Sequence, residues 1–504
     1  MANFISRFVE EIGLFTLIRA SKDVHILCFQ RFIRMFAYGQ VTIILALFFS
    51  VLGVSADRTG LFMTCTLLGD VIISFVLTLV ADKLGRRRIL AAGALLMFSS
   101  GIVFSYATNF WLLLVAAIVG VISPSGNEIG PFRAVEESTV AHLTDLQDRS
   151  DLYAWYSLLG AFGAALGTIS CGWIVQKLQD DFNWTARNSY RVIFLIYSVI
   201  AIAKFVATLM LSADTELDDA SQEQVHKHEP IRQAEQGQSS LNSSSGSRAE
   251  TYPMRPLSNK SIDSFVIDDD DDVEEEEEEQ DREEVLDEMD QFVAAPVKKR
   301  SKLLFWVDYL PQISSRSKKI VFQLTILFAI DSFGSGLATS TWISYYFSDR
   351  FQVKEGVLGT LFFVTNLVSA ASALVASSIA KRLGPIITMV VTHLPSSSIL
   401  AILGLPSSER VAMLLLVIRS CTASMDVGPR QAFLSSVVSK EERTSVMGFV
   451  NVVKTLAQAG APSLMGKFAS VRLMPVGFLV AGLCKVGYDL GILFSFLGTQ
   501  LHNS

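Results

Sequence analysis

The chain has 504 residues, of which 50% are hydrophobic and 18% are charged, and its formal net charge is −7. Long uncharged blocks such as Val41–Val54 and Ile89–Phe104 hold much of the apolar content, whereas a soluble protein spreads it over amphipathic faces. A helix of about 20 mostly apolar residues crosses a bilayer. The composition therefore excludes a soluble globular domain and predicts an all-α membrane protein with many spans.

The acidic charge is confined to one segment. Ser261–Asp290 contains 18 acidic residues and one Arg, so the rest of the chain is basic. The net charge therefore gives no reason to expect a cationic partner, and we expect no nucleic acid. The five cysteines stand singly, without the spacing of a disulfide framework or a metal site. We expect no metal and no cofactor.

The N-terminal residues 1–30 are predicted to form a cytoplasmic segment. Within residues 1–20, apolar residues recur at helical spacing around Glu10 and Glu11, which indicates an amphipathic helix lying on the membrane face. No cleavable signal peptide is visible, so the first span is expected to act as an uncleaved insertion signal.

Twelve apolar stretches follow, six on each side of a long polar segment. The predicted spans are 32–54, 58–81, 88–106, 110–138, 151–176, 189–212, 317–347, 355–380, 384–404, 409–435, 443–467 and 472–497. They predict an N-terminal six-helix bundle over residues 31–212, a C-terminal six-helix bundle over 317–497, and a cytoplasmic tail at 498–504.

The polar segment between the bundles, residues 213–316, includes five consecutive Asp (268–272) and six consecutive Glu (274–279). Such a segment buries too little apolar surface to offset the entropy of ordering it, so we expect a disordered cytoplasmic linker. Near its end, Leu303–Ile313 regains apolar character after a basic cluster, which predicts an interfacial helix leading into the seventh span.

The two halves repeat one another in sequence. Four matches occur in the same order and at nearly constant offset, which indicates an internal duplication. The matched pairs are Tyr38-Gly39 with Phe333-Gly334, Gly60 with Gly359, Val80–Gly85 with Ile379–Gly384, and Glu128–Pro131 with Asp426–Pro429. A duplicated six-helix unit is typical of transporters that rock two bundles around a central site.

The short loops predict the orientation of the chain. Lys and Arg gather after the second, eighth and tenth spans, while the opposite loops are poorer in them. The positive-inside bias then places both termini and the linker in the cytoplasm. Asn183-Trp184-Thr185, between spans five and six, is a glycosylation sequon that this topology places outside, so Asn183 is predicted to carry a glycan.

Asp82-Lys83-Leu84-Gly85-Arg86-Arg87-Arg88 resembles the loop signature of the major facilitator superfamily between its second and third helices. Gly85 permits a tight turn there, and Asp82 can accept hydrogen bonds from a helix end or from an Arg such as Arg86 or Arg87. The resemblance extends from about residue 20 to 497, the linker excepted. It implies the major-facilitator-type fold, with 12 transmembrane helices as two six-helix bundles.

Two further segments, Arg31–Gly39 and Met425–Gln431, are similar to those of a poorly characterised branch of this family, and no substrate follows from that. Thr78 stands where the family loop usually has Gly. The fifth span lacks the Gly-Pro core of the drug–proton antiporter signature, so that motif does not support export by antiport. Its Gly163 and Gly167 are expected to serve close helix packing.

Charged residues inside the bilayer are candidates for function, because each costs at least ~2.5 kcal/mol unless it has a partner or a water-lined cavity. In the fold that the sequence resembles, helices one, four, seven and ten line the cavity. We expect a cytoplasmic gate in which acids and bases pair and hold the two bundles together. Its residues are Arg34, Glu128, Arg133, Glu137, Asp426 and Arg430. The candidates for substrate or coupling-ion binding are Asp331, Arg419 and Gln40, followed by Asp70 and Lys454.

Asp331 and Arg419 lie near mid-membrane in this prediction and are expected to face each other across the cavity as an ion pair. An anionic group competing for Arg419, or protonation of Asp331, would break that pair. A purely structural role for both is an equal alternative. Lys204 and Lys485, on spans that usually pack outside the cavity, are expected to pair or to extend toward the interface.

The sequence thus predicts a secondary active transporter of a small organic solute, coupled to protons and working by alternating access. We expect it to function as a monomer in the plasma or vacuolar membrane. A non-transporting sensor or scaffold on the same fold, with the linker as its output, is the alternative. No arrangement of nucleophile and base or of metal ligands indicates an enzyme.

Overall fold

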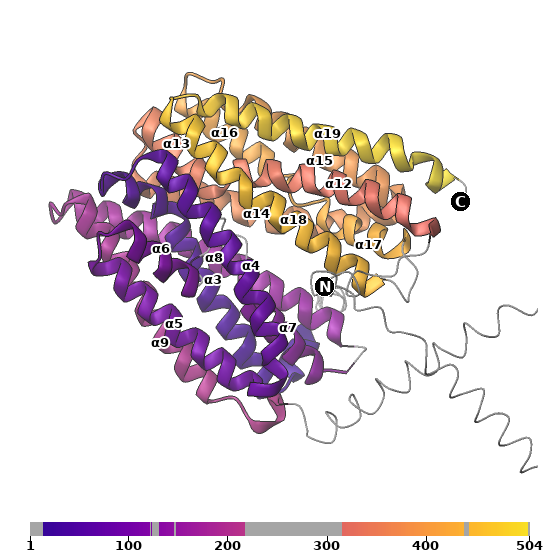
Figure 1. The fold of residues 1–504 in the computed structure, drawn as a ribbon, viewed down its shortest axis with the longest axis horizontal. Helices are drawn as coiled ribbons and strands as arrows, with labels where there is room; N and C mark the ends of the chain where they lie inside the picture. Colours follow the sequence, from indigo (N-terminus) through magenta and orange to yellow (C-terminus); the bar gives the residue numbers. More distant parts are fainter. Residues whose placement is uncertain are drawn as a thin grey trace, which may run out of the picture. The chain divides into compact units, whose positions relative to one another are not determined.

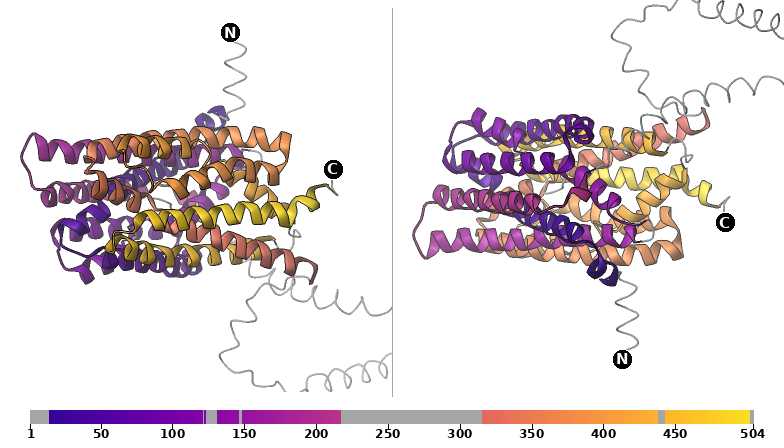
Figure 2. Two further views of the ribbon diagram at one scale, coloured as in Figure 1. Left: turned by 90° about the horizontal axis from the view of Figure 1, so that it is seen from above. Right: turned by 90° about the horizontal axis from the view of Figure 1, so that it is seen from below.

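The computed structural model describes residues 14–120, 122, 131–145, 148–216, 315–437 and 443–501, and the regular structure in these residues is all helical. All of the described residues belong to one compact unit. Both views in Figure 2 show its long helices side by side along a common direction. The prediction of an all-α protein is confirmed.

The N-terminal half runs from indigo to magenta in Figure 1. Its elements are α2 (Leu14–Arg19), α3 (Lys22–Val51), α4 (Ala56–Leu84), α5 (Arg86–Tyr106), α6 (Phe110–Val119), α7 (Pro131–His142), α8 (Arg149–Asp180), α9 (Ala186–Leu209) and the 3-10 turn η1 (Ala213–Thr215). Side-chain caps set several of the starts. Ser21, for example, accepts a hydrogen bond from the third residue of α3, and Asn109 caps α6 in the same way.

The C-terminal half runs from salmon to yellow in Figure 1. Its helices are α12 (Ser315–Leu337), α13 (Ser340–Phe351), α14 (Glu355–Leu383), α15 (Pro385–Ile402), α16 (Glu409–Ser420), α17 (Val427–Val437), α18 (Arg443–Ser470) and α19 (Met474–Leu501).

Each of the twelve predicted spans coincides with one helix or with two consecutive helices. The spans at 110–138, 317–347 and 409–435 are divided, into α6 and α7, α12 and α13, and α16 and α17. In the described residues, eight segments are long and apolar enough to cross a membrane. Membrane crossing by the remaining segments, and the domain boundaries drawn from twelve spans, stay predictions.

The predicted N-terminal amphipathic helix falls mostly on residues 1–13, which lie outside the described residues, and α2 covers only Leu14–Arg19. The linker from residue 217 to 314, with its predicted interfacial helix, also lies outside them.

The turn from the second to the third helix is built alike in both halves. Gly85 has φ 89° and Gly384 has φ 79°, and each directly precedes a helix, α5 or α15. Residues with a Cβ rarely adopt such positive φ, so glycine is required at both places. The two glycines occupy matching positions of the predicted repeat, which the backbone therefore supports.

Small residues bring α8 against α3. A Cβ added to Gly163 or Gly167 would collide with the carbonyl oxygens of Phe32 or Phe36. The close-packing interpretation of these glycines is confirmed, because only a residue without a side chain allows the two backbones to approach so closely.

The two halves meet through α3 with α13, α4 with α18 and α8 with α14. Thr341 and Ser344 of α13 donate hydrogen bonds to the carbonyl oxygens of Thr42 (3.0 Å) and Ile43 (2.8 Å) of α3. Ser463 of α18 donates to Thr64 of α4 at 2.8 Å. Where the structure describes both partners, the hydrogen bonds between the halves lie toward the end of the bundles that carries Val51, Ala56, Asp180, Glu355 and Ser470. We call this the closed end.

Candidate functional site

A buried cluster of charges joins four helices of the N-terminal half. Glu136 of α7 accepts from Arg34 of α3 at 2.5 Å and from Lys204 of α9 at 3.2 Å, and Tyr156 of α8 donates to the same carboxylate at 2.5 Å. The side chains of Arg34, Glu136 and Lys204 are at most 2% exposed. One carboxylate thus holds two cations, which is how charge can be kept at this depth.

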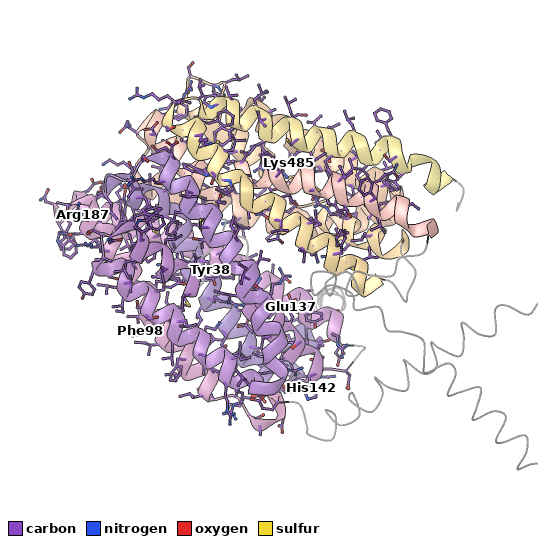
Figure 3. All side chains as sticks on the ribbon, viewed as in Figure 1. Tyr38, Phe98, Glu137, His142, Arg187 and Lys485 are labelled. Atoms are coloured by element: carbon purple, nitrogen blue, oxygen red, sulfur yellow. The ribbon has the colours of Figure 1, made fainter. Side chains whose placement is uncertain are left out.

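The C-terminal half contains a corresponding cluster. The two oxygens of Asp331 in α12 accept separately from Lys485 of α19 at 2.7 Å and from Arg430 of α17 at 3.0 Å. Arg430 also pairs with Asp426, one turn before it, and its guanidinium lies 5.2 Å from the ring centre of Tyr488. Figure 3 shows Lys485 on α19 in this half and Tyr38 and Glu137 in the other.

The two clusters are related by an exchange of charge. In the N-terminal cluster, the first span of the half supplies the Arg (Arg34) and the fourth span supplies the acid (Glu136). In the C-terminal cluster, the first span of the half supplies the acid (Asp331) and the fourth span supplies the Arg (Arg430). The last span of each half contributes a Lys to its cluster, so of the two alternatives expected for Lys204 and Lys485, pairing or extension toward the interface, both lysines pair.

The predicted ion pair between Asp331 and Arg419 is wrong. Both oxygens of Asp331 are occupied, because α19 packs against α12 and brings Lys485 to one oxygen while the side chain of Arg430 reaches the other from α17. Arg419 lies on the side of α16 that carries the buried Ala412 and Leu416, and its buried Nε has no hydrogen-bond partner in the described residues. Asp331 forms no hydrogen bond with Arg419 and acts on it only electrostatically.

Among the described residues, the predicted cytoplasmic gate does not join the two bundles. Arg34 pairs with Glu136, and Arg430 pairs with Asp426 and Asp331, so each pair stays inside one half. Arg133 and Glu137 form an exposed pair one turn apart on α7. Glu128 lies outside the described residues.

Glu136 rather than Glu137 is therefore the important acid of α7. The sequence pattern pointed to Glu137 because Arg133 stands one turn before it. That pair is satisfied on the helix surface, whereas Glu136 lies on the buried side with Val135 and Val140. The sequence signal that could have identified Glu136 was its position on the apolar face of the helix, and not the presence of a partner on the same helix.

The remaining candidates have separate environments. Gln40 is fully buried and donates to Ser170 of α8 at 3.2 Å, so it binds within its own half. Asp70 of α4 is 1% exposed, and its Oδ1 has no partner in the described residues. Lys454 of α18 is partly exposed, and its ammonium lies 5.7 Å from the ring centre of Phe328.

The loop signature is capped by the first residues of the linker. Glu216 accepts from the backbone nitrogens of Arg86 at 2.6 Å and Arg87 at 3.1 Å, at the start of α5. A carboxylate is favoured there by the partial positive charge of a helix N-terminus. The side chain of Asp82 lies outside the described residues, so its predicted role stays a prediction.

A polar group that sequence reasoning missed lies between α15 and α19. Asp489 accepts from Ser397 at 2.9 Å and lies 2.7 Å from Nδ1 of His393, and all three are buried. A single His in an apolar stretch carries no spacing signal, because its partner is 96 residues away. Among the described residues, no group of three or more His, Cys, Asp or Glu could hold a metal ion.

The closed end carries an exposed ion pair between the halves. Lys354, at the start of α14, lies 2.9 Å from Asp180, at the end of α8. Hydrogen bonds from Lys354 and from Gln176 hold the pKa of Asp180 below its usual range. Asn183, in the following turn, is exposed and adopts φ 55°, while Thr185 caps α9. The sequon is thus accessible, and its glycosylation stays a prediction.

Comparison with known proteins identifies the family of the chain. The family model described as Major Facilitator Superfamily matches residues 27–462. An uncharacterized membrane protein of Saccharomyces cerevisiae is 34% identical over 485 residues, 95% of each chain.

The fold also resembles solved structures. A D-xylose-proton symporter has a TM-score of 0.60 at 13% identity, covering 93% of this chain and 96% of its own. The inward-open xylose transporter XylE from E. coli has a TM-score of 0.58 at 14% identity, covering 96% of each. The chain is an integral membrane protein that belongs to the major facilitator superfamily of secondary transporters.

Proposed function

We propose that the protein moves a small organic solute across its membrane by alternating access, coupled to protons, and that this structure corresponds to its inward-open state. The observation that carries the proposal is the placement of the hydrogen bonds between the halves. In the described residues these bonds gather at the closed end, which the predicted orientation places outside, while the ion pairs toward the other end stay within each half. Two bundles whose polar contacts lie toward one end can rock about a central site.

Divided helices support the same proposal. The fourth, seventh and tenth spans are each split into two helices, and α16 and α17 are separated by turns at residues 421–426. Irregular backbone at membrane depth is tolerated where it is buried in protein or lines a water-filled cavity. The three divided segments are those expected to line the cavity of this fold.

Asp70 is our candidate for proton coupling. It is buried near the middle of α4, and no cation bonds it in the described residues. Tyr38 of α3 and Tyr197 of α9 lie within electrostatic range of it. A carboxyl group in such a place is costly to ionise, so it would be neutral until water and a proton acceptor reach it from one side.

Transport is tested by metabolite profiling of cells with and without the protein, followed by uptake of the altered solute into proteoliposomes. We expect uptake that an imposed pH gradient accelerates. Asp70→Asn should remove the dependence on the gradient, whereas Asp57→Asn, at the exposed start of the same helix, should retain it. Intact, inserted protein that moves none of the altered solutes would favour the sensor or scaffold.

The site of action and the assembly are part of the proposal. The protein would act in the plasma or vacuolar membrane. It would act as a monomer, because each half buries its own charge cluster without a second chain.

The linker would be cytoplasmic and dispensable for insertion, so deletion of residues 220–295 should leave a correctly inserted protein.

A further inference from the structure

We infer that a recess between α8 and α14, where the two halves of the chain meet, binds an acyl chain of a membrane lipid. The recess lies on the side of these helices that faces the bilayer. Its occupancy does not depend on the proposed transport function.

The recess is apolar and takes its walls from both halves. It has a volume of about 210 Å³. Of the nine described residues that line it, only Asn366 is not hydrophobic. The residues that matter below are Trp155, Phe162 and Ala165 of α8 and Asn366, Leu367 and Ala370 of α14.

The recess opens beside the glycine crossing of the two helices. A Cβ added to Gly359 of α14 would come 3.0 Å from the Cα of Gly172 of α8, so the backbones are in close contact there. Ala165 stands seven residues before Gly172, and Asn366 stands seven residues after Gly359. Seven residues are almost two helical turns, so both lie on the faces that meet at the crossing, about 10 Å farther from the closed end. The helices that touch through glycine thus leave a space between them two turns away.

The open side of the recess faces lipid and not the core. On α8, Phe162 is 43% exposed, and Trp173, three turns along the same side, is 55% exposed. On α14, Leu367 is 47% exposed. Two and a half turns from Phe162 and from Leu367, and so on the opposite sides of the helices, Cys171 and Leu358 belong to the buried core. Both helices are long and apolar enough to cross a membrane, so the outer side of the recess meets bilayer hydrocarbon.

The chemistry of the walls favours an alkyl chain over water. A buried water needs about two to four polar partners, whereas the lining offers the amide of Asn366 and otherwise hydrophobic side chains. Left empty, the recess would deprive its lining of dispersion contacts. An apolar cavity of about 150 Å³ stays dry and accepts a small apolar molecule, so the larger volume here can hold a stretch of acyl chain.

A lipid is the apolar molecule that reaches this opening without crossing water, because acyl chains surround both helices at this depth. The walls belong to different halves of the chain. A bound acyl chain therefore favours the arrangement of the halves that contains the recess over one in which α8 and α14 close together.

The test uses full-length protein in phosphatidylcholine nanodiscs, in which a minor fraction of the lipid carries a photoactivatable diazirine in the middle of one acyl chain. Labelled residues are mapped by mass spectrometry after irradiation. We expect the lining residues of both helices to be labelled several-fold more than Val357, an exposed residue of α14 outside the recess. Ala370→Phe fills the recess and should lower labelling of its α8 wall several-fold. Ala371→Phe, at the exposed next position, should leave that labelling unchanged.

A second pair of variants fills the recess from the other helix, in case Ala370→Phe does not fold. Ala161→Phe, on the α8 wall, should lower labelling of the α14 wall, and Ala154→Phe, at an exposed position of α8 outside the recess, is its control. Equal labelling in the filled and control variants would overturn the inference. Labelling of the recess no stronger than that of Val357 would overturn it too.

Other occupants are distinguished with Ala370→Cys in a chain whose native cysteines are replaced. We expect a water-soluble thiol reagent to modify this cysteine far more slowly than one introduced by Gln352→Cys at an exposed position. Equal rates would show that water fills the recess. A disulfide that joins two copies of the chain through this cysteine would assign the recess to a dimer. Either result would rule out the acyl chain.

Discussion

Gly60 of α4 and Gly466 of α18 lie against each other at the closed end, where a Cβ added to Gly466 would come 3.0 Å from the Cα of Gly60 and 2.6 Å from the carbonyl oxygen of Ala56. Gly359 of α14 has the same relation to Gly172 of α8, at 3.0 Å. Gly60 and Gly359 are matched positions of the predicted internal repeat. The crossings of α4 with α18 and of α8 with α14 are thus each built on a pair of glycines.

Gly466→Ala is therefore expected to separate α4 from α18, because the methyl group would meet backbone atoms that have little room to move. The yield of a disulfide between cysteines placed at Thr64 and Ser463, with the native cysteines replaced, should fall. Gly460→Ala on the same helix is the control, since nothing lies within 4 Å of its added Cβ. Equal cross-linking in both variants would contradict the role of the glycine pair.

Glu136→Gln is expected to destabilise the protein by about 3–5 kcal/mol, the usual loss when one partner of a buried ion pair is removed. Without the carboxylate, Arg34 and Lys204 would remain charged although their side chains are at most 2% exposed. Thermal unfolding of the purified protein measures the effect. The neighbouring Glu137→Gln removes only an exposed pair on one helix and should change stability by less than about 0.5 kcal/mol. Similar melting temperatures for the two variants would argue against the cluster.

The contact between Asp180 and Lys354 is expected to survive acidification from pH 7 to pH 5. The folded-state pKa of Asp180 is lowered, so the pair is fully present above its ordinary pKa of 3.8 and is lost only as the pH falls through the lowered value. Distances between spin labels at Lys177 and Gln352, both exposed beside the pair, should not change over this range. A separation that grows by pH 5 would show that another group controls the closed end.

Asn183→Gln is expected to abolish a glycan-dependent mobility shift. Thr185→Ser is the matched control, because Ser keeps both the sequon and the hydroxyl that caps α9. If a reagent confined to the cytosol labels a cysteine placed at position 183, the topology is the inverse of the predicted one, and the inward-open interpretation is wrong.

The sequence alone determined that the chain is helical, and it predicted where the apolar spans lie and that the halves repeat one another. These properties follow from composition, spans of about 20 apolar residues and short repeated motifs, which are local along the chain. Gly85 and Gly384 illustrate this, since the motif identified both turns and the backbone requires glycine at each.

Only the tertiary structure decided which charges meet. Asp331 pairs with Lys485, 154 residues away, and not with Arg419, and Glu136 replaces Glu137 as the buried acid. Spacing along a helix indicates which side chains share a face, but not which neighbouring helix that face meets. The partners of Asp331 depend on the packing of α19 against α12 and on the reach of the Arg430 side chain from α17, which bring into contact residues that no sequence spacing relates.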